Sequence, residues 1–171
     1  MLFGLLPDCV SSSLYYKNIN QKMLESVIYL SEDQHTIRKN LSSMGLVAFI
    51  ADGSVLPRES GISQKPLRNY VKFQSPDTYR VSFDLPHHGT ITGMGIPKGI
   101  TLIVGGGYHG KSTLLKALEL GVYDHIKGDG REFVITDLTA MKIRAEDGRS
   151  ITIQIFYVHY NLAKWKNNGF F

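Results

Sequence analysis

Gly105-Gly106-Gly107-Tyr108-His109-Gly110-Lys111-Ser112 is the stretch of sequence that decides the fold. It fits the pattern G-x-x-x-x-G-K-[ST] in full, and this pattern describes a loop that wraps around phosphate groups. The apolar run of residues 100–104 leads into the stretch, and residues 111–120 follow with leucines at helical spacing. Strand, loop and helix in this order are the context that the motif requires. The sequence therefore predicts a phosphate-binding P-loop.

The loop residues also predict how a nucleotide would be held. Glycines let successive backbone N–H groups point at phosphate oxygens, and the start of a helix adds partial positive charge. Lys111 is expected to reach the β- and γ-phosphates, the Ser112 hydroxyl to ligate Mg²⁺, and Thr113 to contact the α-phosphate side. ATP and Mg²⁺ are the expected cofactors, with Ser112 as the metal ligand and His109 as a solvent-facing position. The predicted binding residues are Gly105, Gly106, Gly107, Tyr108, His109, Gly110, Lys111, Ser112 and Thr113.

The composition describes an ordinary globular chain. Of its 171 residues 43% are hydrophobic and 20% are charged, and the net charge of +4 is spread without a basic tract. No motif therefore supports a nucleic-acid partner. Cys9 is the only cysteine, which excludes an intrachain disulfide and a thiolate metal cluster. The apolar residues 1–6 end at Pro7 and Asp8, so they form a poor secretory signal and are too few to span a bilayer. We expect a cytoplasmic protein without a membrane partner, and targeting to an organelle stays open.

The remaining pattern predicts alternating helices and strands. Residues 1–20 are expected to be irregular, and helical spacing begins at Gln21. Ser31 and Gln34 match a capping box, which predicts a second helix that runs to about Ser43 and stops at Gly45. Residues 57–68 are expected to form a loop, and residues 111–120 a helix. The predicted strands are residues 46–50, 79–85, 90–96, 100–104, 132–136, 141–145 and 150–155, the last two joined by a turn at Asp147-Gly148.

A few residues outside the loop are weighed as functional. Tyr79 is the better candidate for stacking on a nucleotide base, whereas Phe83 is expected to face the core. Asp137 follows a predicted strand, where a carboxylate ligand of Mg²⁺ would stand, although a turn residue that ends the strand is the preferred interpretation. His35, His125 and His159 show no metal-ligand spacing.

Several longer stretches resemble the predicted ATPases of the ABC class, a soluble family distinct from the transporters. They run from Gly99 to Leu115, from Ala117 to Ile126 and from Gly128 to Phe133, and upstream from Leu46 to Ser54 and from Leu56 to Gly61. The resemblance implies an α/β fold with a P-loop NTPase core of the ABC nucleotide-binding type beside an antiparallel β subdomain. It also implies an ATP sandwich between two copies of the chain, which makes a homodimer an expected partner.

The resemblance stops after Ser150. The family continues to a Gly/Ser-rich signature loop and to an acidic pair that ligates Mg²⁺ and activates water, and neither occurs in the 171 residues. We therefore expect an incomplete fold. Its expected parts are an irregular segment (1–20), an N-terminal α/β part (21–56), a P-loop nucleotide-binding part (57–155) and an unassigned tail (156–171).

Three functions compete at this point. The first is an ATP-binding ABC-class ATPase that is truncated before the Walker B and signature motifs. The second is a non-catalytic module, derived from such an ATPase, that binds nucleotide or a partner. A small P-loop kinase or GTPase using Asp137 is weaker, because an arginine-rich lid and an N-K-x-D motif are both missing from the sequence. Binding without turnover is the expectation.

Overall fold

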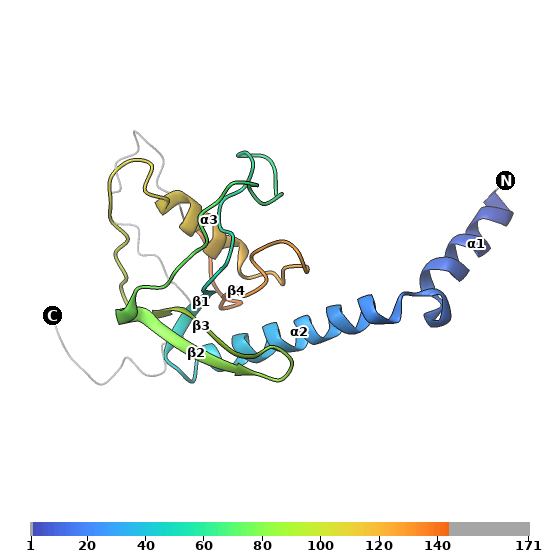
Figure 1. Cartoon of the computed structure of the whole chain (residues 1–171), viewed down its shortest axis with the longest axis horizontal. Coiled ribbons are helices and arrows are strands. Elements are labelled where there is room, and N and C mark those ends of the chain that lie inside the picture. Colours follow the sequence, from blue (N-terminus) through green and yellow to red (C-terminus); the bar gives the residue numbers. More distant parts are fainter. Residues whose placement is uncertain (1, 144–171) are drawn as a thin grey trace. The chain divides into compact units, whose positions relative to one another are not determined.

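The computed structural model describes residues 2–143 of the chain (Figure 1). Its described elements lie in residues 1–141, the first of two compact units. The helices are α1 (Leu2–Leu14), α2 (Gln21–Leu41) and α3 (Lys111–Leu120), with short 3-10 turns η1 (Tyr16–Asn18) and η2 (Asp77–Tyr79). The strands are β1 (Leu46–Ala51), β2 (Arg80–Leu85), β3 (Gly89–Pro97) and β4 (Val134–Thr136).

The four strands form one antiparallel sheet in the order β2-β3-β1-β4. β1 lies inside the sheet, where Ile50 stands opposite Met94 of β3 and Val134 of β4. A strand that is paired on both edges and covered on both faces can be apolar throughout, which explains the uninterrupted run of β1. The predicted strands at 46–50, 79–85 and 90–96 are confirmed. The strand predicted for 132–136 is shorter than expected, because its first two residues lie in a turn.

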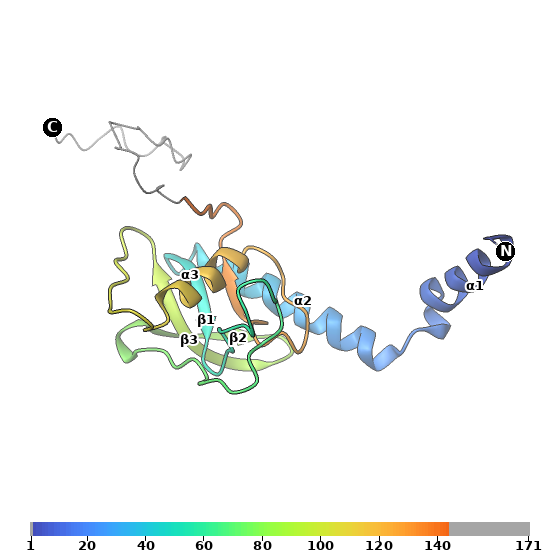
Figure 2. The same ribbon diagram turned by 90° about the horizontal axis from the view of Figure 1, so that it is seen from above.

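Helices cover both faces of this sheet, as Figures 1 and 2 show for α2 and α3. On one face Phe49 packs with Ile37 and Leu41 of α2. On the other face Ile50 packs with Ala117 of α3. Because neighbouring residues of a strand point to opposite faces, β1 contributes to both layers, and β4 does the same with Ile135 and Val134. This α/β/α arrangement agrees with the predicted α/β class, with an antiparallel sheet at its centre.

The N-terminal helices differ from the prediction. Residues 1–20 are not irregular, because α1 and η1 occupy most of them. In α1 the hydroxyl of Ser11 donates to the carbonyl of Asp8, which keeps this polar group inside the helical turn. Ser31 does not begin a second helix, since α2 runs through it without a break. The N-cap is Asn20, whose side chain accepts a hydrogen bond from the backbone of Met23 at 3.2 Å.

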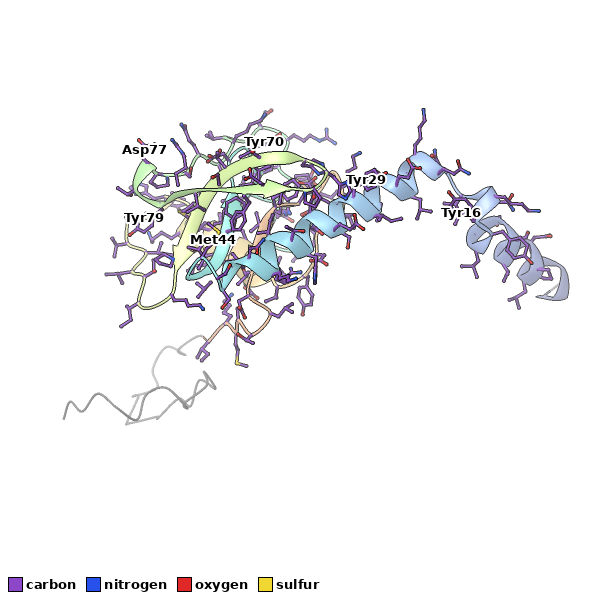
Figure 3. All side chains as sticks on the ribbon, turned by 90° about the horizontal axis from the view of Figure 1, so that it is seen from below. Tyr16, Tyr29, Met44, Tyr70, Asp77 and Tyr79 are labelled. Carbon is purple, nitrogen blue, oxygen red and sulfur yellow. The ribbon has the colours of Figure 1, made fainter. Side chains whose placement is uncertain are left out.

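A buried carboxylate attaches the hairpin between β2 and β3 to α2. Asp33 is fully buried and accepts the backbone N–H groups of His87 and His88, each at 3.1 Å. The Nδ1 atom of His88 lies 2.5 Å from the same carboxylate. Tyr29, labelled on α2 in Figure 3, stacks on the ring of His87 with a centroid separation of 4.2 Å. The turn therefore has a fixed place on the helix.

The predicted strand at residues 100–104 is wrong. This segment has no regular secondary structure, and the side chains of Ile100, Leu102 and Val104 are 103%, 81% and 75% exposed. A strand needs a neighbour to take its N–H and C=O groups, and among residues 2–143 no strand pairs with this segment. Residues 141–143 are irregular too. The rest of the hairpin predicted around Asp147-Gly148 lies outside the described residues.

Candidate functional site

The glycine loop leads directly into α3, as the motif predicts. Gly110 is the N-cap of α3 and has a left-handed backbone with φ of 77°. A side chain is strained in this conformation, so glycine suits the position. The loop also holds Tyr108 at φ of 61°, a left-handed value that is uncommon for a residue other than glycine. The loop therefore contains two residues with left-handed backbone conformation, Tyr108 and Gly110. It ends at the N-terminus of α3, where the first N–H groups of the helix are not used by the helix itself.

The side chain of Lys111 folds back into the loop. Its Nζ atom donates a hydrogen bond of 2.5 Å to the carbonyl of Gly105 and another to the carbonyl of Gly106. The ammonium group thus lies inside the curve of the loop, where phosphate oxygens could replace the two carbonyls as its acceptors. The ring of His109 covers the first glycines, since a Cβ atom on Gly106 would lie 3.2 Å from it. His109 is exposed, as predicted, and yet it forms part of the loop wall.

A pocket of about 390 Å³ lies beside the loop. This volume is within the range of small-molecule sites. Its polar side chains, those of His109, Lys111 and Thr113, all come from the loop and the first turn of α3. Apart from Gly110, the rest of the lining is apolar and comes from three other segments as well as α3: Leu56, Pro57, Val71, Phe73, Ile103, Val104 and Leu114. We call this second set the apolar wall. The pocket therefore combines polar side chains from the loop region with a larger apolar lining.

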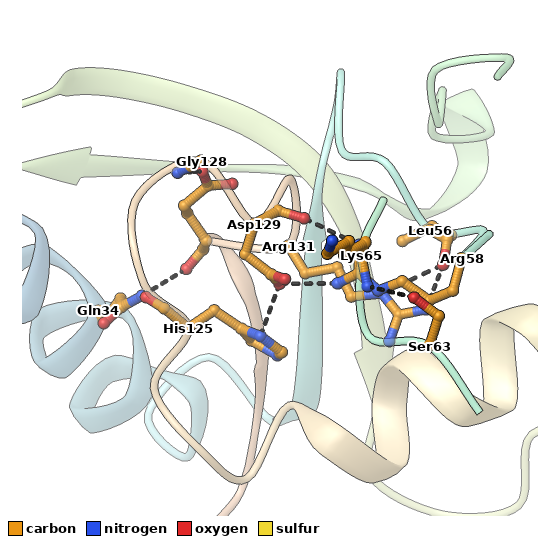
Figure 4. A network of polar contacts seen from close by, with 10 residues as sticks. Gln34, Leu56, Arg58, Ser63, Lys65, His125, Gly128, Asp129 and Arg131 are labelled. Carbon is orange, nitrogen blue, oxygen red and sulfur yellow. Dashed lines mark hydrogen bonds and ion pairs between the residues drawn. The ribbon is translucent and has the colours of Figure 1, made fainter. Parts of the chain in front are cut away.

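A buried network holds the apolar wall at Leu56 (Figure 4). Arg131 is 1% exposed, and its Nε and Nη2 atoms both donate to the carbonyl oxygen of Leu56, the Nε bond at 3.1 Å. Arg58 donates to the backbone carbonyl of Asp129 at 2.8 Å and to its carboxylate at 2.7 Å. Two stretches that are distant in the sequence, 56–61 and 128–133, thus meet beside the pocket. Sequence reasoning singled out both stretches but gave their arginines no role.

This network carries more positive than negative charge. Burial, together with the nearby Arg58 guanidinium, lowers the pKa of Arg131 to about 10, so it stays protonated at neutral pH. Burial also lowers the pKa of His125, whose Nδ1 atom lies 2.8 Å from the carboxylate of Asp129. Within the described residues, three buried atoms of the network have no hydrogen-bond partner: Arg58 Nε, His125 Nε2 and Arg131 Nη1. Two of these three atoms are arginine N–H donors, for which the network supplies no acceptor.

Comparison with known proteins shows the family of this chain. The P-loop domain model of the ABC_ATPase family matches residues 20–159. The chain belongs to this family. The uncharacterized protein MJ1628 of Methanocaldococcus jannaschii is 33% identical over 122 residues, which are 64% of this chain and 26% of that relative. The chain thus spans about a quarter of the length of the curated relative that it matches. Membership in the ABC_ATPase family supports a nucleotide-binding, ATPase-like P-loop.

Other predicted residues of this ABC_ATPase chain have different roles. Phe83 is 4% exposed and belongs to the core, as expected. Tyr79, labelled in Figure 3, is not part of the lining of the pocket beside Lys111 and instead lines a neighbouring hollow with Ile103 and Leu114. Within residues 2–143, no helix has the length and apolar character that a membrane span requires.

Asp137 is a turn residue, as the preferred interpretation held. Its carboxylate accepts the backbone N–H of Thr139 at 2.9 Å and the hydroxyl of Thr139 at 2.6 Å. These hydrogen bonds lower the pKa of Asp137. The carboxylate therefore stabilises the turn after β4 through hydrogen bonds. It does not line the pocket at Lys111.

Proposed function

We propose that this chain binds ATP with Mg²⁺, with the phosphates in the loop of residues 105–112 and the nucleoside against the apolar wall. The presence of both polar and apolar side chains in the lining of one pocket supports this proposal most directly. A nucleotide combines the same two characters, because charged phosphates are joined to a flat and largely apolar base. A site for inorganic phosphate alone would have no use for an apolar wall.

The loop fits the phosphates and the metal ion. Its backbone wraps around the ammonium of Lys111, and Gly110 places the first N–H groups of α3 at the end of the loop. Ser112 is exposed at the first turn of α3, where its hydroxyl is free to take a metal ligand position. Ser112 would hold Mg²⁺ there, and the ion would supply positive charge that offsets part of the phosphate charge. Lys111 would bind the β- and γ-phosphates, and Thr113 would contact the α-phosphate side.

Binding rather than hydrolysis is the activity that we propose. Hydrolysis needs a carboxylate that holds the metal ion and a group that orients water. The described residues that line the pocket include no acidic side chain. The proposed role is thus that of a nucleotide-binding module of the ABC_ATPase family.

Lys111→Ala tests the site directly. Loss of a charged phosphate contact should raise the Kd for Mg-ATP about tenfold to a hundredfold in titration calorimetry. Lys116→Ala is the matched control, because Lys116 lies on the same helix and pairs with Glu119 away from the loop. Equal affinity in both variants and the wild type would show that the loop is not the site. Steady-state phosphate release near 1 s⁻¹, about the low end for this chemistry, would contradict binding without turnover.

A second copy of the chain is the proposed protein partner, with the cytoplasm as the proposed location. Ile100, Leu102 and Val104 leave exposed apolar surface next to the loop, and such surface often marks an interface. The ATP sandwich implied by the family resemblance would use this region. Sedimentation at increasing concentration, with and without Mg-ATP, should show a dimer that nucleotide favours. A monomer under both conditions would contradict the proposal.

A further inference from the structure

A second pocket, of about 360 Å³, is lined by residues of α2, of the turn that joins β2 to β3, and of the segment that leads into β4. Its lining shares no residue with the lining of the pocket at Lys111. Two pairs of rings form part of its surface: Tyr29 stacks on His87, and His88 meets Phe133 edge to face with ring centroids 5.3 Å apart. The volume is within the range of small-molecule sites, and the proposed nucleotide binding leaves this pocket unused.

Two carboxylates fix the hydrogen-bonding roles of the imidazole rings. Asp33 engages Nδ1 of His88, and Glu32 engages Nε2 of His87, each at 2.5 Å. An ionised carboxylate only accepts hydrogen bonds, so the bonded nitrogen of each ring carries a hydrogen, and the other nitrogen of the neutral ring is an acceptor. Asp33 is fully buried and also holds the backbone N–H groups of the turn. The orientation of the His88 ring is therefore built into the fold.

The other polar atoms of the lining are mainly acceptors as well. Oε1 of Glu132 accepts the N–H of Gly128 at 2.6 Å, which leaves Oε2 without a hydrogen-bond partner among the described residues. The hydroxyl of Ser26 donates to the carbonyl of Met23 at 2.8 Å, so its oxygen keeps only acceptor capacity. Lys127 is the one ammonium of the described lining, and it is exposed, whereas Glu132 is partly buried. The lining therefore offers more acceptors than donors, and its cation is its more solvated charge.

The charges favour the same kind of ligand. Three carboxylates belong to this region, those of Glu32, Asp33 and Glu132, against one ammonium. Even with both imidazoles protonated the sum is not positive, so an anion gains no net attraction at the pocket. A cation does gain attraction, and the rings of Tyr29 and Phe133 can add to it, because the face of an aromatic ring attracts positive charge.

We propose that this pocket binds a small organic ammonium ion, a primary amine on a flat apolar body. Glu132 takes the charge, and the acceptor nitrogen of His88 takes one of the N–H groups. The body of the ligand lies against Tyr29, Leu30 and Phe133. This site is separate from the proposed nucleotide site in the glycine loop, so either proposal can fail without the other.

The test compares three probes that share a phenyl ring and differ in charge: phenethylamine, phenethyl alcohol and hydrocinnamate. NMR titration of the whole chain gives the Kd of each probe, and chemical-shift changes show whether the lining residues respond. The amine should bind about tenfold more tightly than the alcohol, and the carboxylate should bind most weakly. Equal affinity for the three probes, tighter binding of the carboxylate, or no response of the lining to the amine would overturn the proposal. This comparison needs no variant, so it stands even if a substitution prevents folding.

Two substitutions test the charges with opposite signs. Glu132→Gln keeps an oxygen that can accept the N–H of Gly128 and removes the charge, so it should raise the Kd of phenethylamine about tenfold. Lys127→Gln removes a charge of the same sign as the ligand and should lower that Kd about twofold. Glu25→Gln is the matched control, because Glu25 is an exposed carboxylate beside Ser26 on α2 that does not line the pocket, and it should change nothing. An unchanged Kd in Glu132→Gln, or weaker binding in Lys127→Gln, would contradict an ammonium site.

Discussion

Two short apolar runs of this chain have similar composition, but one forms a buried strand and the other is irregular and exposed. Leu46–Ala51 forms β1, in which Phe49 and Ile50 are 0% exposed. Residues 100–104 are as rich in β-branched and aliphatic side chains, yet the segment is unpaired and Ile100 is fully exposed. The difference lies in the neighbours, because β1 has β3 and β4 at its edges and a helix on each face. Composition gives a segment its propensity, and partners decide whether the strand forms.

The largest expected effect is a contrast in stability between the two runs. Phe49→Ala should lower the free energy of unfolding by about 3–5 kcal/mol, because it empties a site in contact with Phe83 and α2. Leu102→Ala should change it by less than about 0.5 kcal/mol, because little surface is buried there. Urea denaturation of both variants measures the contrast. Similar losses would mean that residues 100–104 are packed in solution and would remove the distinction.

A pair of glycines sharpens the same comparison. In β3, a Cβ atom at Gly93 would clash with the carbonyl oxygen of Ile50 and would lie 2.7 Å from the Cα atom of Ala51. Gly93→Ala should therefore lower the free energy of unfolding by about 1–3 kcal/mol. Gly107→Ala in the loop should leave stability unchanged without nucleotide, since no atom lies within 4 Å of its added carbon. A thermal melt in which the two variants match would contradict the tight approach of β3 to β1.

The smallest expected effect is a pH dependence of stability caused by His125. This residue lies in the segment that leads into β4, which pairs with β1. Burial lowers the pKa of His125 below 6.5, and the charges of Arg131 and Arg58 add to this. Below about pH 6.5 the unfolded chain therefore binds a proton that the folded chain does not, so stability falls as the pH drops toward the lowered pKa. The urea midpoint should decrease between about pH 7 and about pH 5.5. His125→Gln should flatten this slope, and His109→Gln, at an exposed loop residue, should keep it.

Much of the fold could be predicted from local pattern. The loop, α3 and the β2–β3 hairpin follow from motifs whose partners are close in sequence, and Phe83 of the strand predicted at residues 79–85 faces the core as expected. The single helix α2 was missed because Ser31 and Gln34 imitate a capping box. Only the tertiary packing of residues such as Leu30 and Ile37 shows that no helix starts there. The irregular state of residues 100–104 depends on a missing neighbour, which the segment's own sequence does not reveal.

The site was predicted in part for the same reason. The loop residues lie in a continuous motif, so the sequence identifies them at once. Phe73 and Leu56 come from distant loops without a motif, and only the folded chain brings them to Lys111. Tyr79 was a plausible base contact by residue type, but its position in η2 directs it to a different hollow. The sequence did offer a reason to single out Arg131. It is an arginine next to a glycine turn, and it lies in a stretch that resembles the family.

The bonds from Arg131 to the carbonyl of Leu56 set a rule for exchanging parts between members of the family. The two residues are 75 positions apart, so a chimera that imports residues 46–75 from a relative takes Leu56 and Arg58 from one chain and their partners Arg131 and Asp129 from another. The segment from His125 to Glu132 should be transplanted with it, because it carries Arg131 and also Asp129, the carboxylate partner of Arg58. The part of the chain that supports the pocket is thus built from two segments that are separate in the sequence and have to be exchanged together.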